Sequence, residues 1–207
     1  MSSAALVACG LSLLGGRLCL DFANTVDWRT TDHQVDWLTG YDRLLSWSRH
    51  AGALAEAEVL SLAAKADVRL KEAGVVLARA IALREAIFRI ISSAIKGEPA
   101  IAGDLATLNE ELARAQSAAR IKQDAAGFNW AWRDDALCLD RMLWPVSRSA
   151  TDLLTSDDLS RTRECPADDC HWLFLDTSRN QSRRWCSMES CGNRAKAKRH
   201  YRRTAKR

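Results

Sequence analysis

Four of the seven cysteines in this 207-residue chain form two C-x4-C pairs near its C-terminus. Cys165 and Cys170 are the first pair, and Cys186 and Cys191 are the second. Two such pairs can place four thiolates tetrahedrally around one Zn²⁺, with Zn–S distances of about 2.3 Å. Two disulfides are the alternative, but disulfides are rare in a reducing cytosol and leave the paired spacing unexplained. The pattern therefore predicts one structural zinc ion bound by these four cysteines.

Charge divides the chain shortly before these pairs. Residues 160–207 carry 13 basic and five acidic side chains, whereas the remaining 159 residues carry 17 basic and 21 acidic ones. A mildly acidic body followed by a strongly basic end favours a polyanion as the partner. We therefore expect two domains, a body at residues 1–159 and a zinc module at 160–207.

The body is predicted to be an α+β domain that is mainly α-helical, because most of its apolar residues recur at helical spacing. The expected elements, in chain order, are a short strand at 18–22, two short helices between 36 and 65, a long helix at 68–95, a helix around 105–115, a hairpin at 119–132 and a helix at 134–154. Gly52 separates the short helices, and Pro145 should kink the last helix or lie at its boundary. The sequence has no apolar run of the length that a membrane span needs.

The zinc module has an order of elements that matches treble-clef zinc modules. A cysteine knuckle at 165–170 precedes two expected strands, 172–175 and 183–185, which a polar turn joins. The second cysteine pair then leads into a helix that begins near Cys191. The N-terminus of a helix favours a thiolate through its dipole and its exposed N–H groups, which suits Cys191 as a zinc ligand.

The last helix is strongly basic, with eight basic and no acidic residues between 192 and 207. On a helical wheel these cations cover more than half of the circumference. Phosphate groups are fitting partners, because contacts from Lys and Arg release counterions. The predicted nucleic-acid contacts are Arg183, Arg184, Arg194, Lys196, Lys198, Arg199, Arg202 and Arg203. A solvated tail is the alternative for the helix, and Arg183 or Arg184 could instead balance the negative charge of the zinc site.

Three motifs carry a resemblance to known families. Two lie in the zinc module, Trp172-Leu173-Phe174-x-Asp176-x-Ser178-Arg179-Asn180 and Arg183-Arg184-Trp185-Cys186-Ser187-Met188-x-x-Cys191-Gly192-Asn193-Arg194-x-Lys196. The third is Gly15-Gly16-Arg17-Leu18-Cys19-Leu20-Asp21-Phe22-x-Asn24-Thr25. The first two resemble the CGNR zinc-finger family, and the third resembles the ABATE domain that usually precedes this finger. The resemblance implies a bacterial protein whose treble-clef finger binds DNA and which takes part in stress-linked transcription regulation.

A group of polar residues follows the expected first strand, namely Asp21, Asn24, Thr25 and Arg29. One interpretation is a pocket in the body for a small-molecule effector. The other is that Asp21 and Thr25 cap the turn between strand and helix. No catalytic residues are predicted, because the sequence has no Gly-rich phosphate loop, nucleophile elbow or HExxH motif.

Together these features predict a cytoplasmic, zinc-dependent DNA-binding transcription regulator with no catalytic site and no membrane partner. RNA is the nearest alternative ligand, because zinc modules and basic helices serve both polymers. A protein–protein adaptor, or a small-molecule sensor acting through the body, is an alternative of another class. A homodimer would enlarge the small footprint of one finger.

Overall fold

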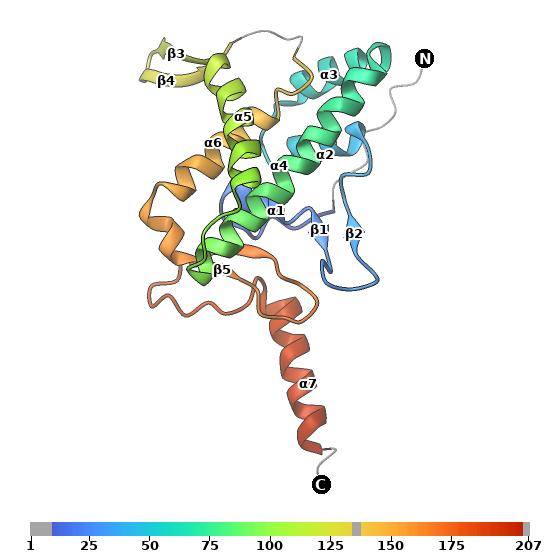
Figure 1. Ribbon diagram of the computed structural model, residues 1–207, viewed down its shortest axis with the longest axis vertical. Helices are drawn as coiled ribbons and strands as arrows, with labels where there is room; N and C mark the ends of the chain where they lie inside the picture. The colour runs from blue at the N-terminus through green and yellow to red at the C-terminus, as the bar shows by residue number, and fades with distance from the viewer. Residues whose placement is uncertain (1–9, 134–137, 205–207) are drawn as a thin grey trace.

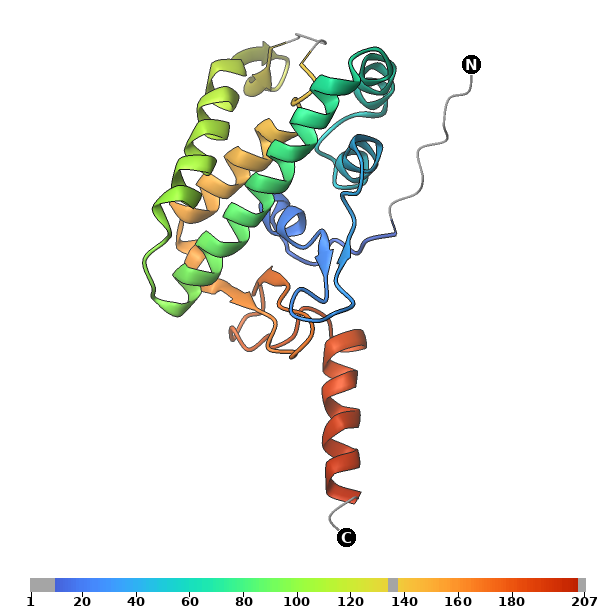
Figure 2. The same ribbon diagram turned by 45° about the vertical axis from the view of Figure 1, so that its right-hand side comes forward.

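A computed structural model describes residues 10–133 and 138–204 of the chain, except the side chain of Arg203. A helical body lies at one end, and a single C-terminal helix projects from it (Figures 1 and 2). The helices, in chain order, are α1 (Leu18–Ala23), α2 (Tyr41–His50), α3 (Glu56–Val68), α4 (Leu70–Lys96), α5 (Ala102–Ala118), α6 (Leu143–Leu154) and α7 (Asn193–Thr204), with a 3₁₀ turn at Asp157–Arg161 and a π turn at Met188–Gly192. The strands pair antiparallel, β1 (Val26–Asp27) with β2 (Val35–Asp36), β3 (Ala119–Asp124) with β4 (Gly127–Trp132), and β5 (Thr162–Glu164) with β6 (Leu173–Leu175). The predicted class, a mainly helical α+β fold, is confirmed.

The central helix of the body is α4, which contacts α1, α2, α3, α5 and α6. Its buried residues include Ala80, Leu83, Ile87 and Ile91, spaced as one face of an amphipathic helix requires. The helix ends at Gly97, whose φ of 72° is a left-handed conformation that glycine adopts without a steric penalty. Among the described residues no helix, including α4, is both long and apolar enough to cross a membrane.

The first predicted strand is wrong, because residues 18–23 form the helix α1. The prediction relied on the alternation of Leu18, Leu20 and Phe22 with less apolar neighbours. All residues of α1 after Leu18 are buried, however, so the helix has no polar face that could reveal its period. Asp21 is buried at its centre, where Oδ1 accepts a hydrogen bond of 2.8 Å from the Gly15 N–H. A polar residue thus occupies a core position because the backbone before the helix pairs with it.

The predicted start of the last body helix is also wrong, since α6 begins at Leu143 rather than near residue 134. Residues 134–137 of that prediction lie outside the described residues. Pro145 falls in the first turn of α6, where a backbone N–H has no intrahelical acceptor and its absence costs nothing. Pro145 therefore lies at the N-terminal boundary of α6, which is one of the two placements expected from the sequence. The pair of short helices divided at Gly52 and the hairpin at 119–132 are confirmed.

The expected hairpin of the zinc module forms with a different partner strand. β6 pairs with β5, with Leu173 opposite Glu164 and Leu175 opposite Thr162, and residues 183–185 form no strand. The other edge of β6 faces the body. The Leu175 N–H donates to the Gly15 carbonyl (2.8 Å), and Asn24 exchanges two 2.8 Å hydrogen bonds with the N–H and carbonyl of Leu173. Both edges of β6 are thus occupied, so neither is available for pairing with residues 183–185.

The zinc module and the body share one hydrophobic core. Leu173, Phe174 and Leu175 of β6 are buried in the same cluster as Leu20 and Phe22 of α1. The predicted domain boundary near residue 160 therefore marks a change of charge, but it does not divide the hydrophobic core. This arrangement fixes the strand part of the zinc module against the body through β6. The last helix of the module, α7, extends away from the body (Figure 2).

Candidate metal centre and nucleic-acid interface

Four buried cysteines converge where the zinc module meets α7. The sulfur atoms of Cys165, Cys170, Cys186 and Cys191 all lie within 4.8 Å of one another. The Cys170–Cys186 and Cys186–Cys191 sulfur pairs are each 3.6 Å apart. These distances are far longer than a disulfide bond of about 2.05 Å. They are close to the separation of about 3.8 Å that follows from tetrahedral Zn–S bonds of about 2.3 Å. The site is therefore positioned to bind one metal ion.

Local backbone features place the two cysteine pairs. The knuckle is closed by the Cys165 N–H, which donates to the Trp172 carbonyl at 2.8 Å. The Ser187 hydroxyl accepts hydrogen bonds from the N–H groups of Glu189 (3.2 Å) and Ser190 (3.4 Å), and so caps the turn that carries Cys191. Gly192 lets the Met188 side chain pack against this turn, because a Cβ atom at this position would lie 2.8 Å from the Met188 sulfur and would displace it. Cys191 thus reaches the site from the turn that leads into α7.

Hydrogen bonds within the cluster favour one thiolate, and a nearby cation lies against another sulfur. Hydrogen bonds from the Cys170 and Cys186 thiols hold the pKa of the Cys165 thiol well below its usual range, and the same pairing raises the pKa of the Cys170 and Cys186 thiols. The Arg194 guanidinium donates to the Cys191 sulfur at 3.3 Å. Four thiolates around one Zn²⁺ carry excess negative charge, so this contact offsets part of it.

Arg183, a predicted nucleic-acid contact, turns inward. Its guanidinium donates to the carbonyls of Leu14 (3.2 Å), Leu175 (3.3 Å) and Cys186 (2.6 Å), and it lies 4.4 Å from the centre of the Phe174 ring. These contacts link the body, β6 and the second cysteine pair. The placement argues against a nucleic-acid contact by Arg183 and favours the alternative, in which its charge lies beside the zinc site.

The remaining predicted contacts with described side chains are exposed and differ in their pairing. Arg194 pairs with Asp169 (3.0 Å), and Lys198 pairs with Asp168 (2.6 Å). Among the described residues, no carboxylate lies within ion-pair distance of Arg184, Lys196, Arg199 or Arg202. The Arg203 side chain lies outside the described part of the structure. The basic surface therefore combines two paired cations with a set of uncompensated ones.

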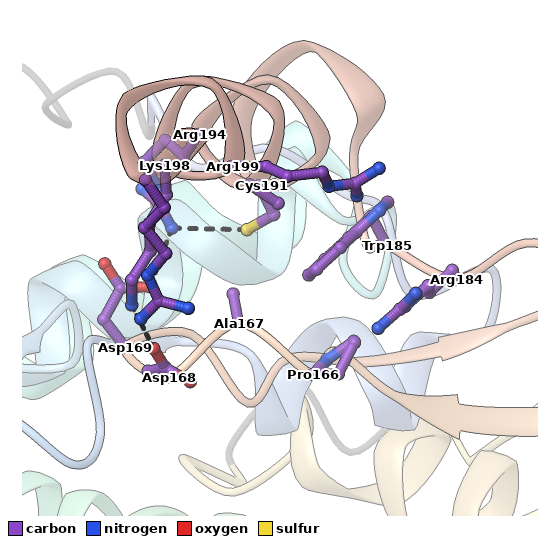
Figure 3. A pocket seen from close by; sticks show the side chains of 12 residues that line it. Pro166, Ala167, Asp168, Asp169, Arg184, Trp185, Cys191, Arg194, Lys198 and Arg199 are labelled. Carbon is purple, nitrogen blue, oxygen red and sulfur yellow. Dashed lines mark hydrogen bonds and ion pairs between the residues drawn. The ribbon is translucent and has the colours of Figure 1, made fainter. Parts of the chain in front are cut away.

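An open cleft of about 570 Å³ lies between α7 and the knuckle loop at residues 166–169 (Figure 3). The two ion pairs connect the loop to the helix on one side of it. Arg184, Trp185, Arg199 and Arg202 also contribute side chains to its walls. The cleft thus places four guanidinium groups, those of Arg184, Arg194, Arg199 and Arg202, and one aromatic ring around a single opening.

Comparison with known families fits this architecture. The ABATE family model, described as "putative stress-induced transcription regulator", matches residues 16–157, which is more than half of the chain. The chain belongs to the ABATE family. The CGNR zinc finger model matches residues 161–204 of this ABATE-family protein, the segment with the four cysteines and α7. The protein therefore carries a zinc finger with one structural Zn²⁺, and both matching families are regulator or zinc-finger families. No curated protein matches the sequence.

The polar residues at the start of the ABATE domain make hydrogen bonds within the fold. Asp21 accepts a hydrogen bond from the Gly15 N–H, and Asn24 exchanges two hydrogen bonds with the backbone of Leu173. The Thr25 hydroxyl donates to the Phe22 carbonyl (2.8 Å), and Arg29 donates to the Ala23 carbonyl and to Glu85, each at 2.7 Å. These bonds account for the buried polar groups without a ligand. A ligand pocket at these four residues stays a prediction.

Three residues that matter in this ABATE-family protein were missed in the sequence. Asp168 and Asp169 pair with α7, and Trp185 lines the cleft. Their sequence signals were present but ambiguous, because acidic residues between two ligands usually form a solvated loop. Trp185 directly precedes the ligand Cys186, so the sequence indicates that it lies close to the metal. The sequence does not indicate whether its ring is exposed.

Proposed function

We propose that this protein is a zinc-dependent DNA-binding transcription regulator that contacts duplex DNA with α7. The observation that carries the proposal is the placement of α7, which projects from the body with exposed cations and no acidic residue of its own (Figure 1). An α-helix with side chains is about 10–12 Å across, and the major groove of B-DNA is about 12 Å wide. The helix therefore has the size and charge of a groove-binding element.

The zinc site supports this role by fixing the base of α7. In the proposal Cys165, Cys170, Cys186 and Cys191 hold the ion, and Cys191 lies two residues before the helix begins. Toward the far end of the helix, the described side chains of Tyr201 and Arg202 are exposed. Metal binding therefore sets the direction in which the cations point, and zinc loss should abolish DNA binding.

The proposal also covers the type of zinc finger, the location of the protein in the cell and its oligomeric state. The finger is of treble-clef type, since a knuckle and the start of a helix supply the two cysteine pairs. The protein acts in the bacterial cytoplasm, where thiols stay reduced and available to zinc. It binds as a homodimer, because one helix of 12 residues covers only a small part of a DNA site. Its action is binding, without catalysis.

The test is the salt dependence of binding to a mixed-sequence DNA duplex, a single strand and an RNA duplex, by fluorescence anisotropy. The variant Arg199→Gln/Arg202→Gln removes two cations that have no carboxylate at ion-pair distance in the described part of the chain. Each lost phosphate contact should lower the slope of log affinity against log salt by about 0.9, so the variant should lose about two units of slope. The matched control Lys71→Gln/Lys122→Gln removes the same charge from exposed sites on the body.

The outcomes separate the alternatives. Duplex binding that falls in the α7 variant and not in the control supports the proposal. A clear preference for the RNA duplex replaces DNA by RNA as the ligand. Absence of binding to all three polymers overturns the proposal and directs the search to protein partners.

A further inference from the structure

We propose that the cleft between α7 and the knuckle loop binds one unpaired nucleotide. The base stacks on Trp185, and the phosphate contacts Arg184, Arg199 and Arg202. The inference deepens the proposed function, on which it rests for the source of that nucleotide in a nucleic-acid strand. The size, the charge and the aromatic wall of the cleft support this assignment.

The cleft has the volume of a small-molecule site. Its volume of about 570 Å³ lies within the range of about 300–1,000 Å³ that is usual for ligand pockets. It is open on one side, so a nucleotide that remains attached to a strand can enter it (Figure 3). The ion pairs Arg194–Asp169 and Lys198–Asp168 close the opposite wall.

The charge of the cleft selects for an anion. Asp168 and Asp169 neutralise the two cations nearest the knuckle loop. Arg184, Arg199 and Arg202 have no carboxylate within ion-pair distance among the described residues, and all three line the cleft. Guanidinium groups bind phosphate with two parallel hydrogen bonds, which suits them to this ligand.

The aromatic wall selects for a base. In the view of Figure 3 the Trp185 side chain points into the cleft, with Arg184 and Arg199 on its two sides. The Arg184 guanidinium lies 5.1 Å from the centre of the ring. Trp185 is half-buried, so its position is fixed while part of the ring remains accessible. Bases stack on such rings with little dependence on sequence.

The nucleotide must be unpaired to use this wall. In a duplex both faces of a base are stacked on its neighbours, so only an extruded, looped or terminal base can reach Trp185. The same chemistry is offered by a free nucleoside triphosphate. An experiment with both sources therefore tests the cleft and identifies the source.

The experiment compares a 20-base-pair duplex with the same duplex carrying one extra adenine as a bulge. The wild-type protein should bind the bulged duplex about ten-fold more tightly, the expected size of one base–aromatic stack. The ratio of the two Kd values should fall to about one in Trp185→Leu, and it should persist in Trp185→Phe, which keeps an aromatic ring. Arg184→Gln should reduce the ratio as well. Zinc content is measured for every variant, because Trp185 precedes a zinc ligand.

The control variant is Lys196→Gln, which removes an exposed cation of α7 that does not line the cleft. It should weaken binding to both duplexes and leave their ratio unchanged. The free source is tested by direct binding of dATP, with inorganic triphosphate as the charge-matched probe without a base.

The outcomes separate the cleft proposal from the proposed function. Equal affinity of the wild type for bulged and paired duplexes overturns the cleft proposal and leaves duplex binding by α7 intact. Trp185-dependent binding of dATP without DNA binding supports the cleft with a free nucleotide and overturns the proposed function. Triphosphate binding as tight as dATP binding shows that the cleft holds only charge and overturns base recognition. Absence of binding to every probe overturns both proposals.

Discussion

Two helices of this protein carry several arginines each, and they use them in opposite ways. On α4, Arg84 is 2% exposed and forms two hydrogen bonds with Asp36, at 2.7 and 2.8 Å. Arg79 and Arg89 of the same helix pair with buried carboxylates of α5, Glu111 and Asp104. On α7, by contrast, Arg199 and Arg202 are exposed and have no carboxylate at ion-pair distance among the described residues.

The contrast shows which arginines hold the fold and which are free to bind. A buried arginine whose donors are satisfied by carboxylates has nothing left for a ligand, and its removal leaves a charge without a partner. An exposed arginine without a partner contributes little to stability, so it can be replaced with little cost to the fold. We expect substitutions on α4 to change the free energy of unfolding and substitutions on α7 to change affinity.

The largest expected effect comes from Cys186→Ser, which removes one of the four sulfur atoms. Zinc content should fall from one equivalent to none, and DNA binding should be lost. Residues 165–170 and 186–204 should lose protection in hydrogen exchange, while β5 and β6 keep theirs because the shared core holds them. Zinc content and exchange are measured by mass spectrometry. Cys138→Ser, at a half-buried cysteine outside the cluster, is the control and should keep its zinc. Retention of a full zinc equivalent in Cys186→Ser would rule out the assigned site.

The next effect concerns the paired arginines of α4. Arg84→Met should lower the free energy of unfolding by about 3 kcal/mol, because Asp36 loses its ion-pair partner and Glu85 keeps only Arg29. Urea unfolding measures this loss, and the DNA affinity of the folded protein should stay unchanged. Arg199→Gln is the reciprocal control, with weaker DNA binding and unchanged stability. A loss of affinity in folded Arg84→Met would break the distinction between the two helices.

Acid pH gives an independent check on the same pair. Burial is the largest single influence on the pKa of Asp36 and would raise it. The hydrogen bonds from Arg84 and the Leu38 N–H, together with the charges of Arg84 and Arg29, outweigh burial and hold that pKa below its usual value of 3.8. A carboxylate with a lowered folded pKa stabilises the fold above its unfolded pKa, and this stabilisation is lost as the pH falls through the folded value. The wild type should therefore lose stability below about pH 3.8. Arg84→Met should show a shallower loss over the same range.

Much of the fold was predictable because its signals are local. The periodicity of α4 and the turn between β3 and β4 are contained within the segments that form them. The nature of α1 and the occupant of the second edge of β6 were not predictable in this way. A short helix buried on all sides has no amphipathic pattern, and the second edge of β6 is taken by Asn24, 149 residues away in sequence. Pairing over such separations depends on the whole fold.

The candidate site follows the same rule. The spacing of the cysteines predicted the metal cluster, because four ligands in two short pairs restrict their own geometry. The basic residues looked equivalent in the sequence, yet Arg183 turns inward, Lys198 pairs with Asp168, and Arg199 has no carboxylate at ion-pair distance within residues 10–133 and 138–204. The direction of each side chain depends on which groups the fold places nearby. Composition could therefore indicate the type of ligand but not the residues that contact it.

A smaller effect is expected at the junction between body and zinc finger. Asn24→Ala leaves the N–H and the carbonyl of Leu173 buried without partners, which should cost about 2 kcal/mol of unfolding free energy. Because β6 belongs to the shared core, the cost should be the same with zinc bound and after chelation. Urea unfolding in both states measures it, with Asn109→Ala at an exposed site on α5 as the control. A cost that disappears on chelation would assign β6 to the finger instead of the body.

The smallest effect should come from the acidic residues beside α7, which separate paired from unpaired cations within one helix. The hydrogen bond from Lys198 holds the pKa of Asp168 below its usual range, so this carboxylate stays charged at neutral pH. Its negative charge is therefore removed by a substitution. Asp168→Asn frees Lys198 for phosphate, and DNA affinity should rise about two- to threefold, the scale of one exposed ion pair. Asp152→Asn makes the same charge change on α6, where Asp152 pairs with Arg148. Competition titrations at one salt concentration compare the two variants. An equal gain in both would mean that only the total charge matters, whereas a gain confined to Asp168→Asn would show that the knuckle loop competes with DNA for a cation of α7.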